Sequence, residues 1–377
     1  MPKAGRAAIC LMGLLRFLLA CAVIIEHTSP VLGMKLTGAT IAVQSFFMIS
    51  GFYMALILNQ KYIGAGSYSL FITNRFLKLF PIYWIVLVGV LALTGYYWAR
   101  HGNLGIFAVW SDYALDWKSA AYLALTNLLI FGQDLTLFLK FAPDMTLAFT
   151  TSFSQSSPPV YRFLLIPPAW SLGLELTFYV MAPWLLRRST VFLGVLMSLS
   201  LMLRYFLAVR LGLDHDPWTY RFFPLEIALF LAGAIAFKAY VAMSWARIPN
   251  RLLWAAFGVI LLFTFVGRHI HLWVFYGCFA LALPFIFRLT RNSVLDRHIG
   301  DLSYPMYVSH LLVFWALSIS GILDNAAAEY RGALTIICTA LLSTGLVWIS
   351  RPIENWRSHR VGAGSPMLRS GKPMTAP

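Results

Sequence analysis

Long apolar runs separated by short, mostly basic stretches make up most of the chain. A helix of about 20 predominantly apolar residues is long enough to cross the hydrocarbon core of a bilayer. Ten runs approach or exceed this length, and they cover residues 7–29, 39–58, 79–99, 168–186, 190–210, 224–241, 252–267, 271–288, 302–322 and 333–350. The pattern predicts an all-α polytopic membrane protein with about ten transmembrane helices.

An eleventh apolar stretch, 119–139, contains polar residues that include Gln133 and Asp134. Lys and Arg accumulate in the cytoplasmic loops of membrane proteins. If 119–139 does not cross, most Lys and Arg fall inside, whereas a crossing would turn Arg187 and Arg188 outward. We therefore expect 119–139 to be re-entrant or interfacial, with both termini of the protein in the cytoplasm.

The composition agrees with a membrane protein, because 60% of the residues are hydrophobic and only 11% are charged. The formal net charge of +15 lies mainly between the apolar runs, so we interpret it as loop charge and expect no nucleic-acid partner. The four Cys lie within apolar runs and show no disulfide or metal-site spacing. We expect no metal site.

The polar parts of the chain suggest one membrane domain and a tail. Residues 143–168 are rich in Pro, Ser and Thr and predict a loop outside the membrane. Residues 359–377 predict a disordered, basic cytoplasmic tail, which leaves 1–358 as the transmembrane domain. Lys3 and Arg6 precede an apolar run without a convincing cleavage site, which predicts a retained signal anchor.

The first apolar run carries two ionisable residues, Arg16 and His27. Their separation of eleven residues is three helical turns plus about 20°, so both side chains share one helix face. They are separated along the helix axis by about 16 Å. Ionisable residues within a membrane span usually line a pathway or a site, so we expect the chemistry at this face.

Two further motifs follow in the next predicted helices. FFMISGFYMAL at 46–56 contains a Gly that favours close helix packing. NRFLKLFPIYW at 74–84 places Arg75 and Lys78 three residues apart, on one helix face. These two side chains are either ordinary cytoplasmic loop charge or a phosphate-binding pair.

Two motifs later in the chain also place polar groups among apolar ones. PAWSLGLELTFYVMAPW at 168–184 puts Glu175 inside a span, where it forms either a structural ion pair or part of a site. SYPMYVSH at 303–310 ends in His310, which is either a buried, hydrogen-bonded histidine or a functional one.

Taken in this order, and with PIENW at 352–356, the motifs resemble those of the membrane acyltransferase-3 family, which includes O-antigen and exopolysaccharide O-acetylases. The resemblance extends over about 16–356. Some residues depart from the family pattern: Lys78 stands where Arg is usual, and Gly173 and Leu176 interrupt a sequence nearer WSLSVEEQFY. Because Lys lacks the planar fork of Arg, the first departure weakens an inference of bidentate phosphate binding.

The resemblance implies an acyl-CoA-dependent membrane O-acyltransferase. It would move an acyl group, commonly acetyl, from cytoplasmic acyl-CoA to a hydroxyl of an extracytoplasmic glycan, either a polysaccharide or a lipid-linked intermediate. It further implies a multi-pass protein of the bacterial cytoplasmic (inner) membrane, in contact with lipids, with acyl-CoA as co-substrate and no bound cofactor. The alternative functions are a proton-coupled secondary transporter, against which the missing internal repeat counts, and a non-catalytic scaffold.

Roles for individual residues follow from the polar face and the resemblance together. His27 would act as general base on the acceptor hydroxyl or carry the acyl group covalently, and Glu175 would hold its imidazole in one tautomer. Arg16 either stabilises negative charge near the donor or organises the bundle, while Arg75 and Lys78 would bind the phosphates of the donor. Supporting residues are expected in the same motifs, namely Ser50, Trp170, Ser171, Tyr304 and His310.

Overall fold

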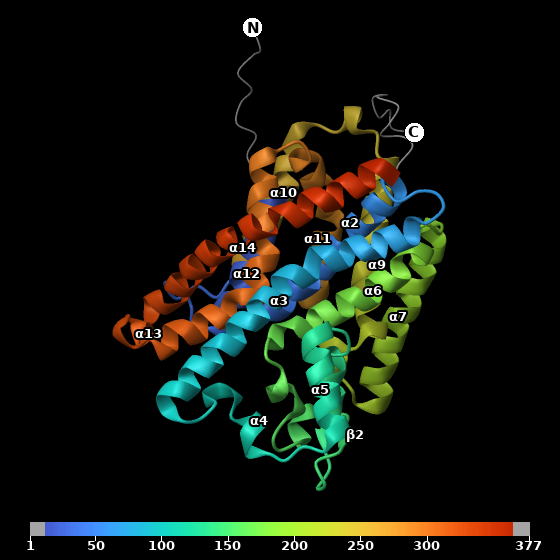
Figure 1. The fold of residues 1–377 in the computed structure, drawn as a ribbon. Coiled ribbons are helices and arrows are strands. Elements are labelled where there is room, and N and C mark those ends of the chain that lie inside the picture. The colour runs from blue at the N-terminus through green and yellow to red at the C-terminus, as the bar shows by residue number, and fades with distance from the viewer. Residues whose placement is uncertain (1–11, 365–377) are drawn as a thin grey trace.

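The computed structural model describes residues 12–364, and it confirms an all-α polytopic membrane protein that is 79% helical (Figure 1). Each of the ten predicted spans corresponds to one helix. These helices are α1 (Met12–His27), α2 (Ala39–Gln60), α3 (Ser67–His101), α6 (Trp170–Leu185), α7 (Thr190–Leu211), α9 (Phe223–Ala242), α10 (Asn250–Val266), α11 (Leu272–Thr290), α12 (Val294–Ile319) and α14 (Ala328–Gly364).

Short elements connect these helices. They are the α-helices α4 (Val109–Asp112), α5 (Trp117–Leu129), α8 (Trp218–Arg221) and α13 (Ile322–Asn325), the strands β1 (Leu139–Phe141) and β2 (Leu147–Phe149), and the 3₁₀ turns Gly105–Phe107, Asp134–Phe138, Phe153–Gln155, Val160–Phe163, Pro167–Ala169, Trp245–Arg247 and Gly267–His269. Within the described residues, seven helices are long and apolar enough to cross a membrane. Helices α1, α6 and α10 are shorter, with 16, 16 and 17 residues. The count of ten spans and the cytoplasmic termini therefore stay predictions.

Two helices extend beyond the apolar runs that predict them. Helix α3 has 35 residues and begins at Ser67, so the motif at 74–84 lies wholly inside it. Helix α14 continues to Gly364, so the first residues of the predicted tail, 359–364, are helical, and the division of the chain at residue 359 stays a prediction. Hydropathy detects only the part of a helix that suits the bilayer, whereas the helix itself can continue through the polar residues that flank the apolar run. Residues 365–377, and the start of the predicted signal anchor before residue 12, lie outside the described residues.

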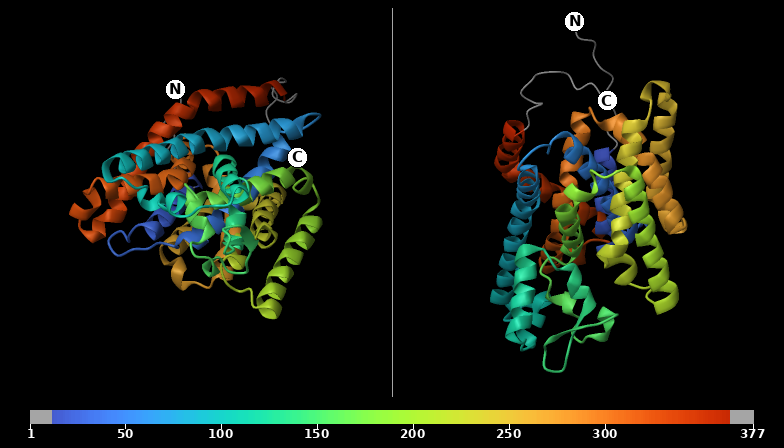
Figure 2. Two further views of the ribbon diagram at one scale, coloured as in Figure 1. Left: turned by 60° about the horizontal axis from the view of Figure 1, so that its bottom comes forward. Right: turned by 90° about the vertical axis from the view of Figure 1, so that its right-hand side faces the viewer.

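The segment between α3 and α6 occupies the end of the bundle opposite the α2–α3 connection and the end of α14 (Figures 1 and 2). Its helix α5 has 13 residues and is about 20 Å long, too short to cross a hydrocarbon core of about 30 Å. Residues 143–168, further along the same segment, contain no α-helix and consist of loop, the strand β2 and 3₁₀ turns. This geometry agrees with a segment that does not cross, and its interfacial or re-entrant position stays a prediction.

The polar residues of 119–139 serve as contacts between this segment and the bundle. The amide of Asn127 donates to the Phe163 carbonyl at 2.9 Å, and its oxygen accepts from the Leu165 amide at 2.7 Å. The Gln133 amide donates to the Tyr83 hydroxyl of α3 at 2.9 Å. The same side chains that lower the hydropathy of this segment therefore fix it against α3 and the following loop.

Helices α2 and α9 approach so closely that only glycine fits at two positions. A Cβ atom on Gly51 would lie 1.8 Å from the Phe230 carbonyl oxygen, and one on Gly233 would lie 1.8 Å from that of Met48. This close approach confirms the interpretation of the Gly in the motif at 46–56 as a packing residue.

Helix α1 is held against α12 in a similar way. A Cβ atom on Gly300 would lie 2.9 Å from the Cα of Gly13. The Asp296 carboxyl group accepts from the backbone amides of Gly13 and Leu14 at 2.7 and 3.2 Å. An acidic oxygen at free helix amides is favourable, so this contact fixes the start of α1, four residues before Arg16.

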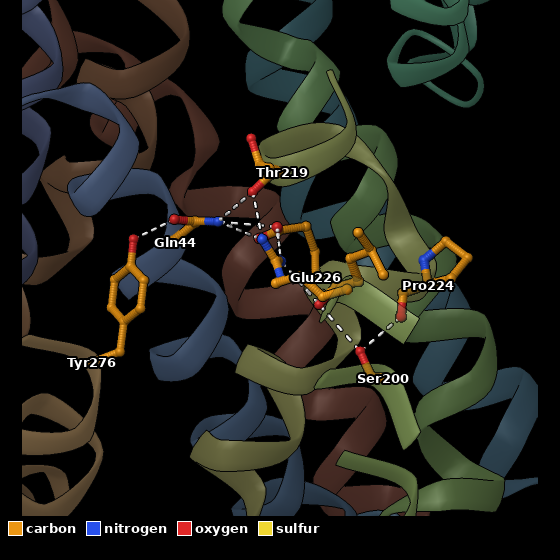
Figure 3. Close-up of polar contacts among 8 residues, drawn as sticks. Gln44, Ser200, Thr219, Pro224, Glu226 and Tyr276 are labelled. Carbon is orange, nitrogen blue, oxygen red and sulfur yellow. Dashed lines mark hydrogen bonds and ion pairs between the residues drawn. The ribbon is translucent and has the colours of Figure 1, made fainter. Parts of the chain in front are cut away.

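A buried polar network joins α2, α7, α9 and α11 (Figure 3). Glu226 is fully buried, and its carboxyl group accepts from Gln44 at 2.9 and 3.0 Å and from Arg204 at 2.7 Å. The Tyr276 hydroxyl donates to the Gln44 oxygen, and Arg204 also donates to the Thr219 carbonyl at 2.7 Å. Helices α2 and α7 therefore bind the buried carboxyl group of α9 directly, and α11 contacts it indirectly, through Gln44.

Candidate active site

A cavity of about 570 Å³ runs along α2 and is enclosed by α1, α3, α6, α11 and α12. Its lining on α2 extends from Val43 to Gln60, which corresponds to about 26 Å along the helix axis. The cavity is therefore nearly as long as a bilayer core is thick. Seven of the ten candidate site residues line it, namely Arg16, Ser50, Arg75, Lys78, Ser171, Glu175 and Tyr304.

The charge of the cavity wall is strongly positive. Its acidic residues are Glu175, Asp296 and Asp301, and Asp296 is already engaged by the amides of α1. The more numerous basic residues are Arg16, Lys61, Arg75, Lys78, Arg291, Arg297 and Arg357. A confined site with this excess of cations favours an anionic ligand.

Three of these cations have unused hydrogen-bonding capacity. Arg75 is only 7% exposed, and its Nε has no hydrogen-bond partner within the part of the chain that the structure describes. Its guanidinium carbon lies 5.7 and 5.9 Å from the ring centroids of Phe71 and Tyr179. Arg16 and Lys78 likewise form no ion pair with any described residue. Because a buried donor without a partner is costly, this set of cations is suited to bind an anion.

Glu175 forms a cluster with residues of two motifs. Its carboxyl group accepts from the Ser50 hydroxyl of α2 at 2.7 Å and from the Tyr179 hydroxyl one turn along α6. The structural ion pair, one of the two interpretations of Glu175, is not formed among residues 12–364. The carboxyl group instead faces the cavity, close to Arg75 through the shared neighbour Tyr179.

His27 lies at the end of α1, exposed and outside the cavity lining. Its ring centroid lies 5.3 Å from that of His310, and the two rings are tilted by 31°. The structure does not bring Glu175 and His27 into contact, since Glu175 binds Ser50 and Tyr179. Hydropathy alone does not fix the depth of a residue in the bundle or its rotation about the helix axis, so the sequence could not show this separation.

Tyr307 connects the cavity to the histidine pair. Its side chain lines the cavity, and its hydroxyl lies 2.7 Å from the Ser171 hydroxyl and donates to the Pro168 carbonyl at 2.9 Å. Its own carbonyl oxygen lies 2.7 Å from Nδ1 of His310. Sequence reasoning missed Tyr307, although its place three residues before His310 in the motif at 303–310 puts both on one helix face.

The two remaining supporting residues have structural contacts. Trp170 is 6% exposed, and the Arg221 guanidinium lies 4.3 Å from its ring centroid while pairing with Asp216 at 2.7 Å. Arg221 and Glu26, the residue directly before His27, are the charged groups that interact electrostatically with the His27 ring. The Tyr304 hydroxyl donates to a backbone carbonyl of α3 at 2.6 Å and so fixes the wall of the cavity.

Gly173 explains one departure from the family pattern noted above. A Cβ atom at this position would lie 2.7 Å from Oδ1 of Asp134. Asp134 is 7% exposed, and this oxygen has no hydrogen-bond partner among the described residues. Glycine in the motif at 168–184 therefore allows the segment after α5 to pack directly against α6.

Comparisons with known proteins test the family resemblance of the chain. A protein from Aquifex aeolicus (strain VF5), described only as an uncharacterized protein, is 28% identical over 222 residues, which cover 54% of this chain and 90% of that protein. No solved structure matches the chain. A family model described as an acyltransferase domain matches residues 12–351. With this match over most of its length, the chain belongs to the acyltransferase-3 family.

Proposed function

We propose that this membrane acyltransferase moves an acyl group, most simply acetyl, from cytoplasmic acyl-CoA to a hydroxyl of an extracytoplasmic glycan. The observation that carries the proposal is the long, positively charged cavity, whose wall at Tyr307 also holds one of the two adjacent imidazoles. Such a cavity suits a long anionic donor, and an exposed imidazole suits an acceptor hydroxyl.

The distribution of cations supports acyl-CoA as the donor. The nucleotide of coenzyme A carries several phosphate charges, which Arg binds well. Arg291, Arg297 and Lys61 lie at the same end of the lining as the α2–α3 connection and would hold these phosphates. Arg75 and Lys78 lie deeper on α3 and would bind phosphate or amide oxygens of the donor.

The chemistry proposed for His27 is general base catalysis. The imidazole takes the proton of the acceptor hydroxyl while the hydroxyl oxygen forms a bond to the thioester carbonyl carbon. The carbon–sulfur bond breaks, and the proton on the imidazole passes to the leaving thiolate. In the two-step version, the imidazole nitrogen itself accepts the acyl group before the hydroxyl does. Arg16 would balance negative charge on the donor.

The test is acyl transfer by purified protein in sealed proteoliposomes, with radiolabelled acetyl-CoA on one side of the membrane and surface glycans from cells that lack the protein on the other. Mass spectrometry then locates the acetyl group on the glycan. His27→Ala should lower the rate by about two to four orders of magnitude. His271→Ala, at an exposed histidine at the start of α11, should leave it unchanged. A stable His27→Ala protein with near-normal transfer would refute the catalytic assignment, and movement of label without a new ester would favour transport.

A further inference from the structure

The tautomer of His310 follows from its contact with Tyr307. The His310 side chain is fully buried, and its Nδ1 lies 2.7 Å from the Tyr307 carbonyl oxygen. Because a carbonyl oxygen only accepts hydrogen bonds, Nδ1 carries the proton. In the neutral ring, Nε2 is then an unprotonated acceptor.

This acceptor nitrogen has no hydrogen-bond partner among residues 12–364. A buried acceptor without a partner is destabilising, and such atoms are uncommon enough in native proteins to require an explanation. The neighbouring ring is His27, at a centroid distance of 5.3 Å. When nitrogens of two such rings point at each other, this separation brings them to about 3 Å, a normal hydrogen-bond distance.

We propose that His310 is the positioning residue for His27. Rotation of the exposed His27 ring brings one of its N–H groups to Nε2 of His310, which accepts the hydrogen bond. The other nitrogen of His27 is then unprotonated and available to the acceptor hydroxyl. This inference rests on the proposed function and transfers to His310 the role first expected of Glu175.

The surroundings of His27 favour His310 over a carboxylate for this role. Glu175 is engaged by Ser50 and Tyr179 and lies in the cavity wall. Arg221, the cation near His27, is paired with Asp216. Glu26 directly precedes His27 on α1 and is exposed, and side chains one residue apart on a helix do not face each other. The fully buried His310, in contrast, is fixed by Tyr307 and presents one defined acceptor.

Two substitutions separate positioning from packing. In His310→Asn the amide can still donate to the Tyr307 carbonyl, as Nδ1 does, but no atom remains at the place of Nε2. In His310→Gln an amide oxygen can reach that place and accept from His27. We expect His310→Asn to lower kcat by about tenfold or more with little change in the KM for acetyl-CoA, and His310→Gln to recover much of the loss. Near-normal kcat in His310→Asn, or equal losses in both variants, would overturn the proposal.

A second measurement does not depend on acyl transfer. Nitrogen NMR of protein labelled with ¹⁵N-histidine, with His27→Ala for assignment, reports the tautomer of His27. The wild-type protein should show one dominant tautomer, and His310→Asn should show a mixture of both. The same tautomer populations in both proteins would refute the pairing. If the populations change but the wild-type protein transfers no acyl group, the pairing stands and the proposed function fails.

Discussion

Replacing Arg204 by Met should destabilise the bundle by about 2 kcal/mol, because it removes one ligand of the buried Glu226 carboxyl group. Removal of one partner from a buried ion pair typically costs about 3–5 kcal/mol in soluble proteins. Polar contacts between membrane helices contribute less, about 0.6 kcal/mol on average, because unfolded helices find other partners within the membrane. Gln44 remains bound to Glu226 at 2.9 and 3.0 Å, so the expected loss lies between these limits.

The assay is reversible unfolding in mixed micelles with increasing dodecyl sulfate. Arg210→Met is the matched control, because Arg210 lies on the same helix and is exposed. A Glu226→Gln variant and the double variant complete a cycle, in which the double variant should lose at least about 1 kcal/mol less than the sum of the single losses. The assigned contribution of the ion pair is refuted if the free energies of unfolding of Arg204→Met and Arg210→Met agree within about 0.5 kcal/mol. It is also refuted if the double variant loses the full sum of the Arg204→Met and Glu226→Gln losses.

Three further expectations follow. Replacing Arg75 or Lys78 by Gln should raise the KM for acetyl-CoA more than it lowers kcat. Unchanged steady-state kinetics would indicate that both residues serve only as cytoplasmic charges that orient the protein in the membrane. Burial raises the pKa of the Asp134 carboxyl group from 3.8 to about 6, so the folded protein retains a proton that the unfolded chain releases. Stability should therefore fall as the pH rises from about 4 to about 6. Asp134→Asn, which cannot ionise, should show a smaller fall than the wild-type protein in unfolding measurements at several pH values. Single cysteines in 100–118 and 143–167 should both react with an impermeant thiol reagent added from outside, whereas reaction of 143–167 only after permeabilisation would contradict the ten-span topology.

The positions of the helices could be predicted from the sequence, but contacts between helices could not. Each apolar run corresponds to a helix, because apolar composition over about 20 residues is a local property. The hydrogen bond between Ser50 and Glu175 joins residues 125 positions apart, and no local sequence pattern predicts a contact between residues so far apart in the chain. The sequence placed Arg16 and His27 on one face, yet Arg16 lines the cavity and His27 does not.

The Arg204–Glu226 pair was missed although a signal was present. Both residues lie inside or at the edge of apolar runs, where ionisable side chains are costly and need partners. Neither residue belongs to the motifs that carry the family resemblance, and the candidate site residues were chosen mainly from those motifs. Charge alone would have found both residues, while the contribution of Gln44 and Tyr276 depends on how α2 and α11 pack.

In the proposed function, one protein serves a donor and an acceptor on opposite sides of a membrane, and the arrangement of the polar groups bears on how it would do so. Transfer requires the acyl carbon and the acceptor oxygen to come within about 3–3.5 Å of each other. The cavity lining reaches Ser171 and Tyr307, and the imidazole pair lies beyond them. Tyr307 belongs to both parts, because its hydroxyl contacts Ser171 in the wall and its carbonyl holds the proton of His310. In the proposed reaction, a donor that reaches the deep end of the cavity therefore meets the residue that orients the histidine pair, so that donor binding and the alignment of the base depend on the same residue, through its side chain and its backbone carbonyl respectively.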